Sequence, residues 1–229
     1  PWRNDPVSDE PSDALYLRDE DSGDVWSPTS APARRGGAYT VRHGAGRTTY
    51  RHARGGIESR LMIGMATHDP VRIAVLRLTN HDRRERRLSL TSYVEWTLGP
   101  LREHTQHQVV TAFDETHHAV LAWNCFNPAF AHLRAFAALS EHVTSFTTDR
   151  REVLGRNGAL AAPAAMRDAT PMSGSTLAGS DPCAALRCEL TLRAGETREI
   201  AILLAAADSE EEAGTLLETY RDPARAAAA

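Results

Sequence analysis

Four carboxylates lie close together in residues 16–28, which read YLRDEDSGDVWSP. They are Asp19, Glu20, Asp21 and Asp24. A pair of carboxylates can cleave a glycosidic bond when the two groups face each other across it, about 5–10 Å apart. Acids that are neighbours in sequence usually point to opposite sides or lie solvated on a turn. The stretch therefore favours a structural turn over a catalytic pair.

The same residues have the pattern of a β-hairpin. One short strand leads in, residues 21–24 turn, and a second strand leads out. Gly23 suits such a turn because glycine adopts a positive φ without steric cost. A turn presents side chains, so we expect Arg18, Asp19 and Trp26 to be available for a ligand or another domain, with Trp26 suited to stacking on a sugar ring.

The histidines and glycines give weaker signals. His117 and His118 are adjacent and would point to opposite faces of a strand, whereas zinc needs three or four converging ligands. We therefore expect no metal site. The Gly44-Ala45-Gly46 run continues into a strand and not a helix, which argues against a nucleotide-phosphate loop. His43, just before it, could line a sugar or phosphate site or could pack within its loop.

Residues 155–182 form the longest stretch without periodicity, and they are rich in Gly, Ala, Ser and Pro. We expect a loop there with one short helix near residues 161–167. Loops of this length are often functional or pack against a neighbour. Arg156 and Asn157 could reach an anionic or hydroxylated ligand from it, although Asn-Gly is also a common turn sequence.

The composition excludes several classes of function. Net charge is −4, and all 26 basic residues are arginines spread along the chain, which predicts no nucleic-acid partner. No apolar run approaches the ~18 residues of a membrane span, so this segment should make no membrane contact. The three cysteines form no CxxC pair, which fits a reducing, cytoplasmic setting.

Alternation with a period of two dominates the 229 residues. It is typical of half-buried antiparallel strands. Ten or more short strands predict a mostly β fold with two packed antiparallel sheets. We interpret three short polar segments as hairpin tips: residues 80–85, 115–117 and 193–197.

One helix is predicted, over residues 210–221. Ser209 and Glu212 form a capping box before it, and Leu216 and Leu217 belong to its apolar stripe. Asp222-Pro223 should end it. We expect residues 1–207 to form the β domain and residues 208–229 to form the helix and the start of a linker. Neither end looks like a natural terminus, so we expect a longer polypeptide.

Beyond the 16–28 stretch, five blocks resemble, in order, the glycosyltransferase 36 region of cyclic β-1,2-glucan synthases and cellobiose-type phosphorylases, grouped as glycoside hydrolase family 94. The glucan synthase subgroup fits best. The chain departs from the family at Arg47, where an aromatic residue is usual, and in residues 203–205, which lack an expected glycine. The blocks are WRNDPVSD at 2–9, YTVRHG at 39–44, SYVEW at 92–96, LGRNG at 154–158 and DPCAAL at 181–186.

The resemblance implies a galactose-mutarotase-like β-supersandwich that does not itself hold the catalytic acid. In such proteins a downstream (α/α)6 barrel acts on β-glucan, inorganic phosphate is the co-substrate, and no cofactor is needed. The resemblance also suggests a homodimer and is compatible with an inner-membrane anchor elsewhere in the parent. Six residues are predicted to wall the active site or meet the barrel: Arg18, Asp19, Trp26, His43, Arg156 and Asn157.

Two alternatives stay open at this point. An independent carbohydrate-binding module would need a rim of exposed aromatic residues, for which only Trp26 and Tyr39 qualify. A mutarotase-type epimerase would need a glutamate base and a histidine acid on one sheet face, and Glu95 and His43 are the residues to nominate. Trp96 shares its strand face with aliphatic residues, so we expect it in the core.

Overall fold

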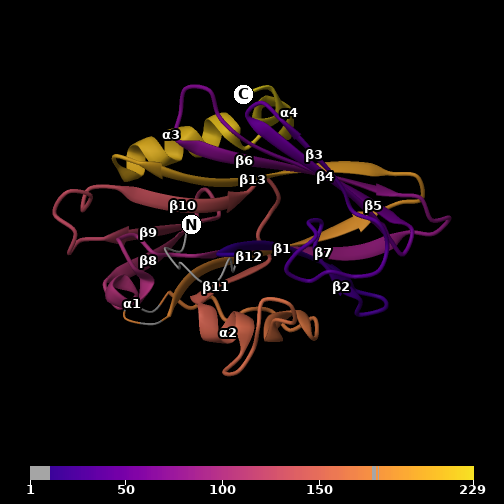
Figure 1. Ribbon diagram of the computed structural model, residues 1–229, viewed down its shortest axis with the longest axis horizontal. Helices are drawn as coiled ribbons and strands as arrows, with labels where there is room; N and C mark the ends of the chain where they lie inside the picture. The colour runs from indigo at the N-terminus through magenta and orange to yellow at the C-terminus, as the bar shows by residue number, and fades with distance from the viewer. Residues whose placement is uncertain (1–10, 177–178, 180) are drawn as a thin grey trace.

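A computed structural model of the chain describes residues 11–176, 179 and 181–229. In this part of the chain two antiparallel sheets pack face to face, as Figure 1 shows. The predicted two-sheet antiparallel sandwich is therefore confirmed. The WRNDPVSD block at residues 2–9 lies outside the described residues.

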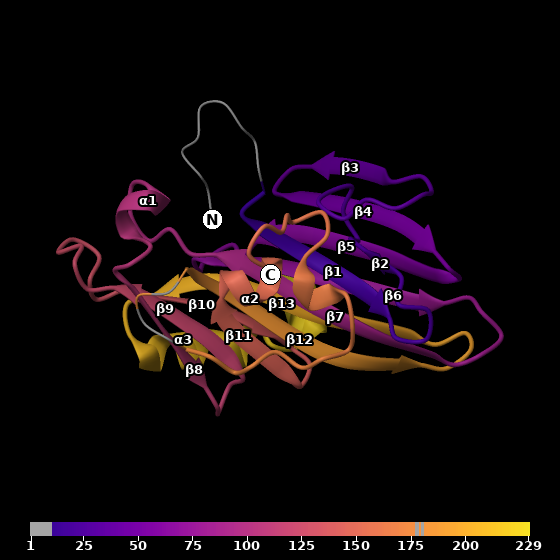
Figure 2. The ribbon, with the colours of Figure 1, turned by 90° about the horizontal axis from the view of Figure 1, so that it is seen from below.

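The smaller sheet has five strands and the larger has eight, and every pair of hydrogen-bonded neighbours is antiparallel. Figure 2 shows the larger sheet continuing past the smaller one toward β3 and β4. In spatial order the smaller sheet consists of β11 (Ser145–Asp149), β12 (Pro182–Leu192), β7 (Arg86–Glu95), β1 (Asp13–Asp19) and β2 (Val25–Trp26). The larger consists of β3 (Thr40–Gly44), β4 (Arg47–Arg54), β5 (Ile57–Met65), β6 (Val71–Asn80), β13 (Thr197–Ala207), β10 (Arg134–Leu139), β9 (Ala119–Asn124) and β8 (Val109–Asp114).

Two of the three predicted hairpin tips are corners between the sheets. Residues 80–85 join β6 to β7 and residues 193–196 join β12 to β13, so each connection leaves one sheet for the other. Period-two alternation cannot distinguish a corner between two sheets from a hairpin within one sheet, because the strands on either side of a corner keep the same pattern. Asn80 holds the corners together, since its carboxamide nitrogen donates to the carbonyl oxygens of Arg84 (2.8 Å), Leu192 (3.0 Å) and Arg193 (3.0 Å). The third tip does join β8 to β9 within one sheet.

The space between the sheets holds the main core, which alternate side chains of both sheets fill. Leu61, Leu76 and Leu90 are completely buried there, one each from β5, β6 and β7. Trp96 is 3% exposed and belongs to the same cluster. Its predicted core position is confirmed.

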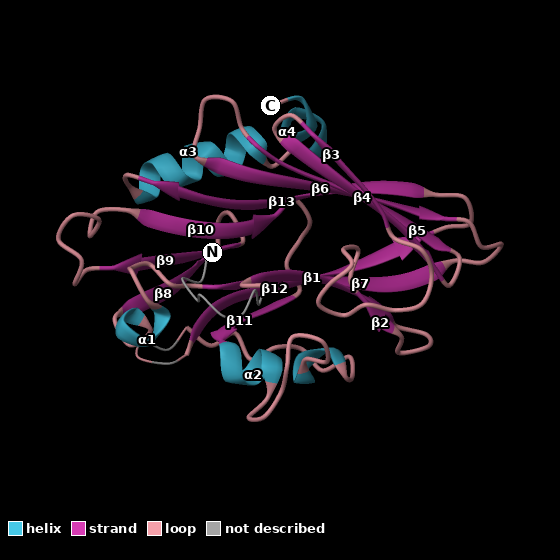
Figure 3. Cartoon of the chain, viewed as in Figure 1, coloured by secondary structure: helices cyan, strands magenta, loops and turns pink. Residues whose placement is uncertain are grey.

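Two helices cover the outer face of the larger sheet, α3 (Glu210–Tyr220) and α4 (Pro223–Ala228), as Figure 3 shows. The Ser209 hydroxyl accepts the backbone N–H of Glu212 at 3.1 Å, as the capping box predicted. The Glu212 carboxylate accepts from Asp208, one residue earlier than expected. α3 ends at Tyr220, just before Asp222-Pro223, as predicted, and Pro223 then begins α4, where its fixed φ and missing N–H are tolerated.

The long segment after β11 covers the outer face of the smaller sheet. It contains α2 (Arg150–Leu154) and a 3₁₀ turn, η1 (Ala164–Met166). The Tyr16 hydroxyl donates to the carbonyl of Leu160 at 2.8 Å, and Arg187 donates to the carbonyl of Thr170 at 2.9 Å. The short predicted helix is present, but the segment also buries Met166 and Met172. The segment therefore contributes to the core under the smaller sheet.

The remaining helix, α1 (Arg102–Thr105), lies between β7 and β8. Within the described residues no helix combines the length and the apolar character that crossing a membrane requires.

Candidate functional site

The predicted hairpin at residues 16–28 is confirmed. Leu17 of β1 lies opposite Trp26 of β2, and Gly23 in the turn has a φ of +73°. Asp19 closes the turn from inside: its Oδ1 atom accepts the backbone N–H groups of Asp21 at 2.9 Å and Ser22 at 3.0 Å. A side chain used in this way is fixed in place and cannot swing toward a ligand.

Asp19 also forms a buried ion pair with Arg86 of β7, and the two residues are 2% and 4% exposed. Burial alone would raise the pKa of Asp19, but the hydrogen bonds from Arg86, Ser22 and Asp21 outweigh it and lower that pKa. The carboxylate is thus ionised at neutral pH. It serves as the counter-ion of Arg86.

The other three carboxylates of the stretch are also paired. Glu20 accepts from Arg18 and, at 2.6 Å, from the Ser89 hydroxyl. Asp21 accepts from Arg87, and Asp24 accepts from Arg54 at 2.6 Å. These contacts support the structural interpretation of the acidic turn.

The hairpin does not present Arg18 and Trp26 as expected. Trp26 is 1% exposed and packs in the main core, and Arg18 is 8% exposed. The prediction that Trp26 is free to stack on a sugar is therefore wrong. The physical reason is that β1 pairs with β7 on its other side, which draws this short hairpin into the sandwich.

His43, Arg156 and Asn157 are exposed, and they come from different parts of the fold. His43 lies on β3 at the edge of the larger sheet, where its Nδ1 atom is 3.0 Å from the hydroxyl of Thr48. Arg156 and Asn157 directly follow α2, which packs on the smaller sheet. The structure does not bring the six predicted residues into one site.

Glu95 is the most buried carboxylate of the candidate set, with no exposed surface. It accepts from the Tyr93 hydroxyl at 2.7 Å and from Arg150 Nε at 2.8 Å, and Arg102 Nε lies 3.6 Å from its other oxygen. Asp181 completes the cluster by pairing with Arg102 and Arg150. Glu95 and His43 thus lie apart, on the smaller sheet and at the far edge of the larger one, which argues against the mutarotase alternative.

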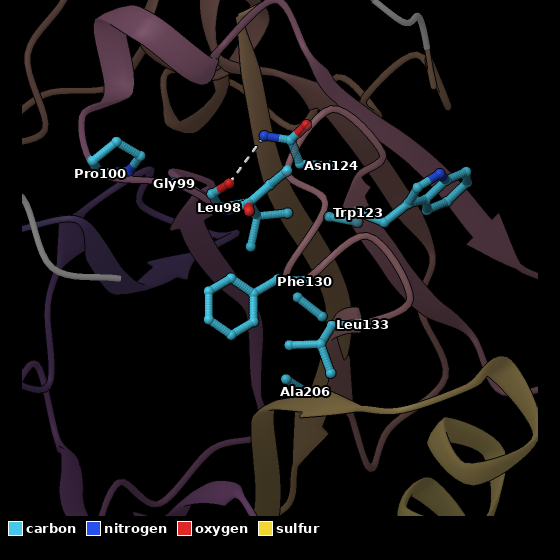
Figure 4. A pocket seen from close by; sticks show the side chains of 11 residues that line it. Leu98, Gly99, Pro100, Trp123, Asn124, Phe130, Leu133 and Ala206 are labelled. Atoms are coloured by element: carbon cyan, nitrogen blue, oxygen red, sulfur yellow. Dashed lines mark hydrogen bonds between the residues drawn. The ribbon is translucent and has the colours of Figure 1, made fainter.

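A pocket of about 460 Å³ lies at the end of the sandwich near β9 and β10. Figure 4 shows Leu98, Phe130 and Leu133 side by side in it, with the indole ring of Trp123 pointing away. Small side chains on three strands leave the space open: Ala122, Ala135 and Ala206.

The rim of this pocket combines an exposed aromatic ring with amides. Phe130 is 58% exposed at the pocket, and Phe126, which precedes it in the same segment, is 70% exposed. Asn124 is already engaged, because it donates to the carbonyl of Leu98 at 3.0 Å and accepts the N–H of Phe126 at 3.0 Å. Asn127 also lines the pocket. Sequence reasoning missed this site, although two phenylalanines in a strand-free segment, residues 125–133, were a visible signal.

Among the described residues, no group of three potential ligands lies in a position to hold a metal ion. Tyr39 was the second candidate for sugar stacking. One face of its ring is occupied by the ring of His52, with centroids 3.8 Å apart and 2° between the planes. The aromatic rim that a carbohydrate-binding module needs is therefore not built from Trp26 and Tyr39.

A family model for the supersandwich domain of glycosyl hydrolase 94 matches residues 1–223. The match runs through both sheets and α3.

Two curated relatives are similar over nearly the whole chain. Cyclic beta-(1,2)-glucan synthase NdvB of Rhizobium meliloti (strain 1021) is 32% identical over 222 residues, which are 96% of this chain and 8% of that protein. Solabiose phosphorylase of Paenibacillus borealis is 30% identical over 221 residues, which are 92% of this chain and 28% of that protein. The chain thus spans less than a third of the length of either relative.

Among solved structures, a bacterial glucoamylase complexed with acarbose superposes with a TM-score of 0.58 over 91% of this chain and 28% of that one. Sequence identity is 9%, so the likeness concerns the fold alone. It agrees with the sandwich architecture.

Proposed function

The chain belongs to the glycosyl hydrolase 94 supersandwich family, and from this premise we propose that it is the non-catalytic sandwich domain of a larger glycosyltransferase or phosphorylase acting on β-glucans. In this proposal a downstream helical barrel of the same polypeptide carries out the reaction with inorganic phosphate as co-substrate. The sandwich supports that barrel and walls its active site. The observation that carries the proposal is the family match together with two relatives named as a glucan synthase and a phosphorylase.

The state of the carboxylates supports a non-catalytic role. Glycoside cleavage by a carboxylate pair needs one group that can give up a proton and a second that faces it across the bond. Asp19 and Glu95 are each committed to arginines, and the other hairpin acids are paired as well. Such pairing turns the carboxylates toward their arginine partners.

The apolar pocket supports a contact with the helical barrel. Exposed apolar patches with polar rims mark interaction sites, and the exposed Phe130 lines a pocket together with Leu98 and Leu133. The relatives supply the covering chain, since at least 72% of their length lies outside the match. We propose that the barrel covers this end of the sandwich, while Arg156, Asn157 and His43 are the predicted wall residues that remain exposed.

The test uses the isolated chain and the full-length parent. The isolated chain should release no glucose 1-phosphate from β-glucooligosaccharides with orthophosphate. In the parent, Arg156→Ala should lower kcat/KM, because a positioning group acts on the transition state, while the melting temperature of the isolated chain stays unchanged. Arg193→Ala, an exposed arginine on the β12–β13 corner, is the matched control and should leave both unchanged.

Activity of the isolated chain would contradict the non-catalytic role. An unchanged kcat/KM for Arg156→Ala would remove that residue from the wall. The second candidate, an independent carbohydrate-binding module, requires saturable glucan binding by the isolated chain, which we do not expect. We further propose a cytoplasmic location and a homodimer for the parent protein.

A further inference from the structure

Three arginines lie in one row across the larger sheet. Arg51 of β4 is opposite Arg60 of β5, Arg60 is opposite Arg77 of β6, and Arg77 is opposite Glu199 of β13. All three arginines are exposed. The strand neighbours Tyr50, Leu61 and Leu76 pack in the core between the sheets. Because side chains alternate along a strand, the row faces outward.

Such a row is unfavourable unless it is neutralised, since like charges directly opposite each other destabilise a sheet. Arg51 is neutralised by Glu58, with nitrogen–oxygen distances of 2.9 and 3.1 Å. Arg77 lies 3.7 Å from Glu199. For Arg60, between them, the described part of the chain provides no hydrogen bond or ion pair. A local conflict of this kind is typical of a functional position.

The unneutralised charge borders a groove of about 290 Å³ on the outer face of the sheet. Arg47, Arg60 and Arg77 line it together with the hydroxyl-bearing Thr49, and Glu199 is the carboxylate of the lining. Like Arg60, Arg47 makes no ion pair within the described residues. Ala227 of α4 closes one side, and Figure 1 shows this short helix next to the strands that carry the arginines.

We propose that this groove binds the phosphate group of a small soluble ligand, either inorganic phosphate or a phosphate ester. Guanidinium groups form forked, charge-assisted hydrogen bonds with phosphate oxygens, and Thr49 adds a further donor. Three arginines against one glutamate make the groove positive, although the chain as a whole has a net charge of −4. The inference does not depend on the proposed role in a larger enzyme.

Binding is measured by titration calorimetry of the purified chain with sodium phosphate, at an ionic strength held constant with sodium chloride so that screening does not change. Wild-type protein should bind with saturation. Arg60→Gln should weaken the affinity at least tenfold, because the central guanidinium is lost. Arg193→Gln removes the same charge at the β12–β13 corner, outside the groove, and should bind like wild type.

Thermal melts without phosphate show whether each variant is folded. Arg60→Gln should melt no lower than wild type, since it relieves repulsion in the row; Arg47→Gln takes its place if that variant does not fold. Absence of saturable binding to wild type overturns the proposal, as does equal affinity of the Arg60→Gln and Arg193→Gln variants. Glucose 1-phosphate and phosphatidylglycerol vesicles form two further arms. Binding to the vesicles without binding to free phosphate or glucose 1-phosphate would assign the groove to a lipid headgroup and overturn the small-ligand proposal.

Discussion

The hydroxyl group of Tyr93 donates a hydrogen bond of 2.7 Å to Oε1 of Glu95, two residues further along β7. Both residues are completely buried. Burial, and then the charge of Glu95, raises the pKa of Tyr93 far above its usual value, so the phenol stays protonated and keeps donating. The partner arginine, Arg150, approaches the same oxygen at 2.8 Å. Glu95 thus has a structural role, because Tyr93 and Arg150 hold its carboxylate in place.

Tyr93→Phe should therefore destabilise the protein by about 1.5–3 kcal/mol, the range for a hydrogen bond to a charged group. Urea denaturation measures the loss. Tyr220→Phe is the matched control: its hydroxyl bonds to Asp69 in a part-buried position and should contribute less. Equal losses in the free energy of unfolding for the two variants would mean that burial does not strengthen the hydrogen bond between Tyr93 and Glu95.

The ion pair between Asp19 and Arg86 should be one of the costliest to break. Asp19→Asn leaves a buried guanidinium without its main counter-ion, and the free energy of unfolding should fall by about 3 kcal/mol. Asp21→Asn, which affects the exposed partner Arg87, should leave stability nearly unchanged. Chemical denaturation of both variants at pH 7 provides the comparison.

The ion pair between Asp19 and Arg86 should also make the free energy of unfolding depend on pH. The folded-state pKa of Asp19 lies below its unfolded value of about 3.9, so the contribution is fully present above that value and is lost as the pH falls through the folded pKa. Between pH 5 and pH 2 the wild type should lose more stability than Asp19→Asn. Parallel pH profiles for the two proteins would contradict this assignment.

Trp96→Ala should cost about 3–5 kcal/mol, as for other buried aromatic side chains. Trp123→Ala is a suitable control, because that indole is half-buried under the Arg134 guanidinium, 5.1 Å from the ring centroid. It should lose less. A loss below about 1 kcal/mol for Trp96→Ala in a denaturant melt would show that its ring is not in the core.

The three cysteines should differ sharply in reactivity. Cys125 is exposed, whereas burial raises the pKa of Cys188 to about 12 and that of Cys183 well above its usual value. Since the thiolate is the reactive form, a thiol reagent such as DTNB should titrate one thiol rapidly in the native protein and three in denaturant. Cys125→Ser should abolish the rapid phase, and a second fast thiol in that variant would contradict the buried positions.

Local pattern predicted what depends on local sequence. The strand face of Trp96 is aliphatic over several residues, which correctly predicted burial, and Ser209 with Glu212 correctly predicted the start of α3. Trp26 stands on a strand of two residues beside a turn. No local signal shows that β1 also pairs with β7 and draws that turn inward, so its burial depends on residues far away in the sequence.

The corners and the arginine groove were beyond sequence reasoning for the same reason. In the sequence Asn80 belongs to a polar segment that looks like a hairpin tip. Only the fold brings its side chain to the carbonyls of Leu192 and Arg193, which are far away in the sequence. The arginines are spread along the whole sequence, and only the register of β5 and β6 brings Arg60 opposite Arg77. Composition therefore gave no sign of a local excess of positive charge.

The order of strands also determines when the chain can fold. The central β7 of the smaller sheet pairs with β1 and β12, and β13 separates β6 from β10 in the larger sheet. During synthesis, the smaller sheet lacks the interior strand β12 until residue 192 has left the ribosome, and the larger sheet lacks β13 until residue 207 has done so. Pairings this distant in sequence form slowly, and the exposed edges of the unfinished sheets could pair with other chains meanwhile. Any fragment that ends before β13 should therefore aggregate and not fold.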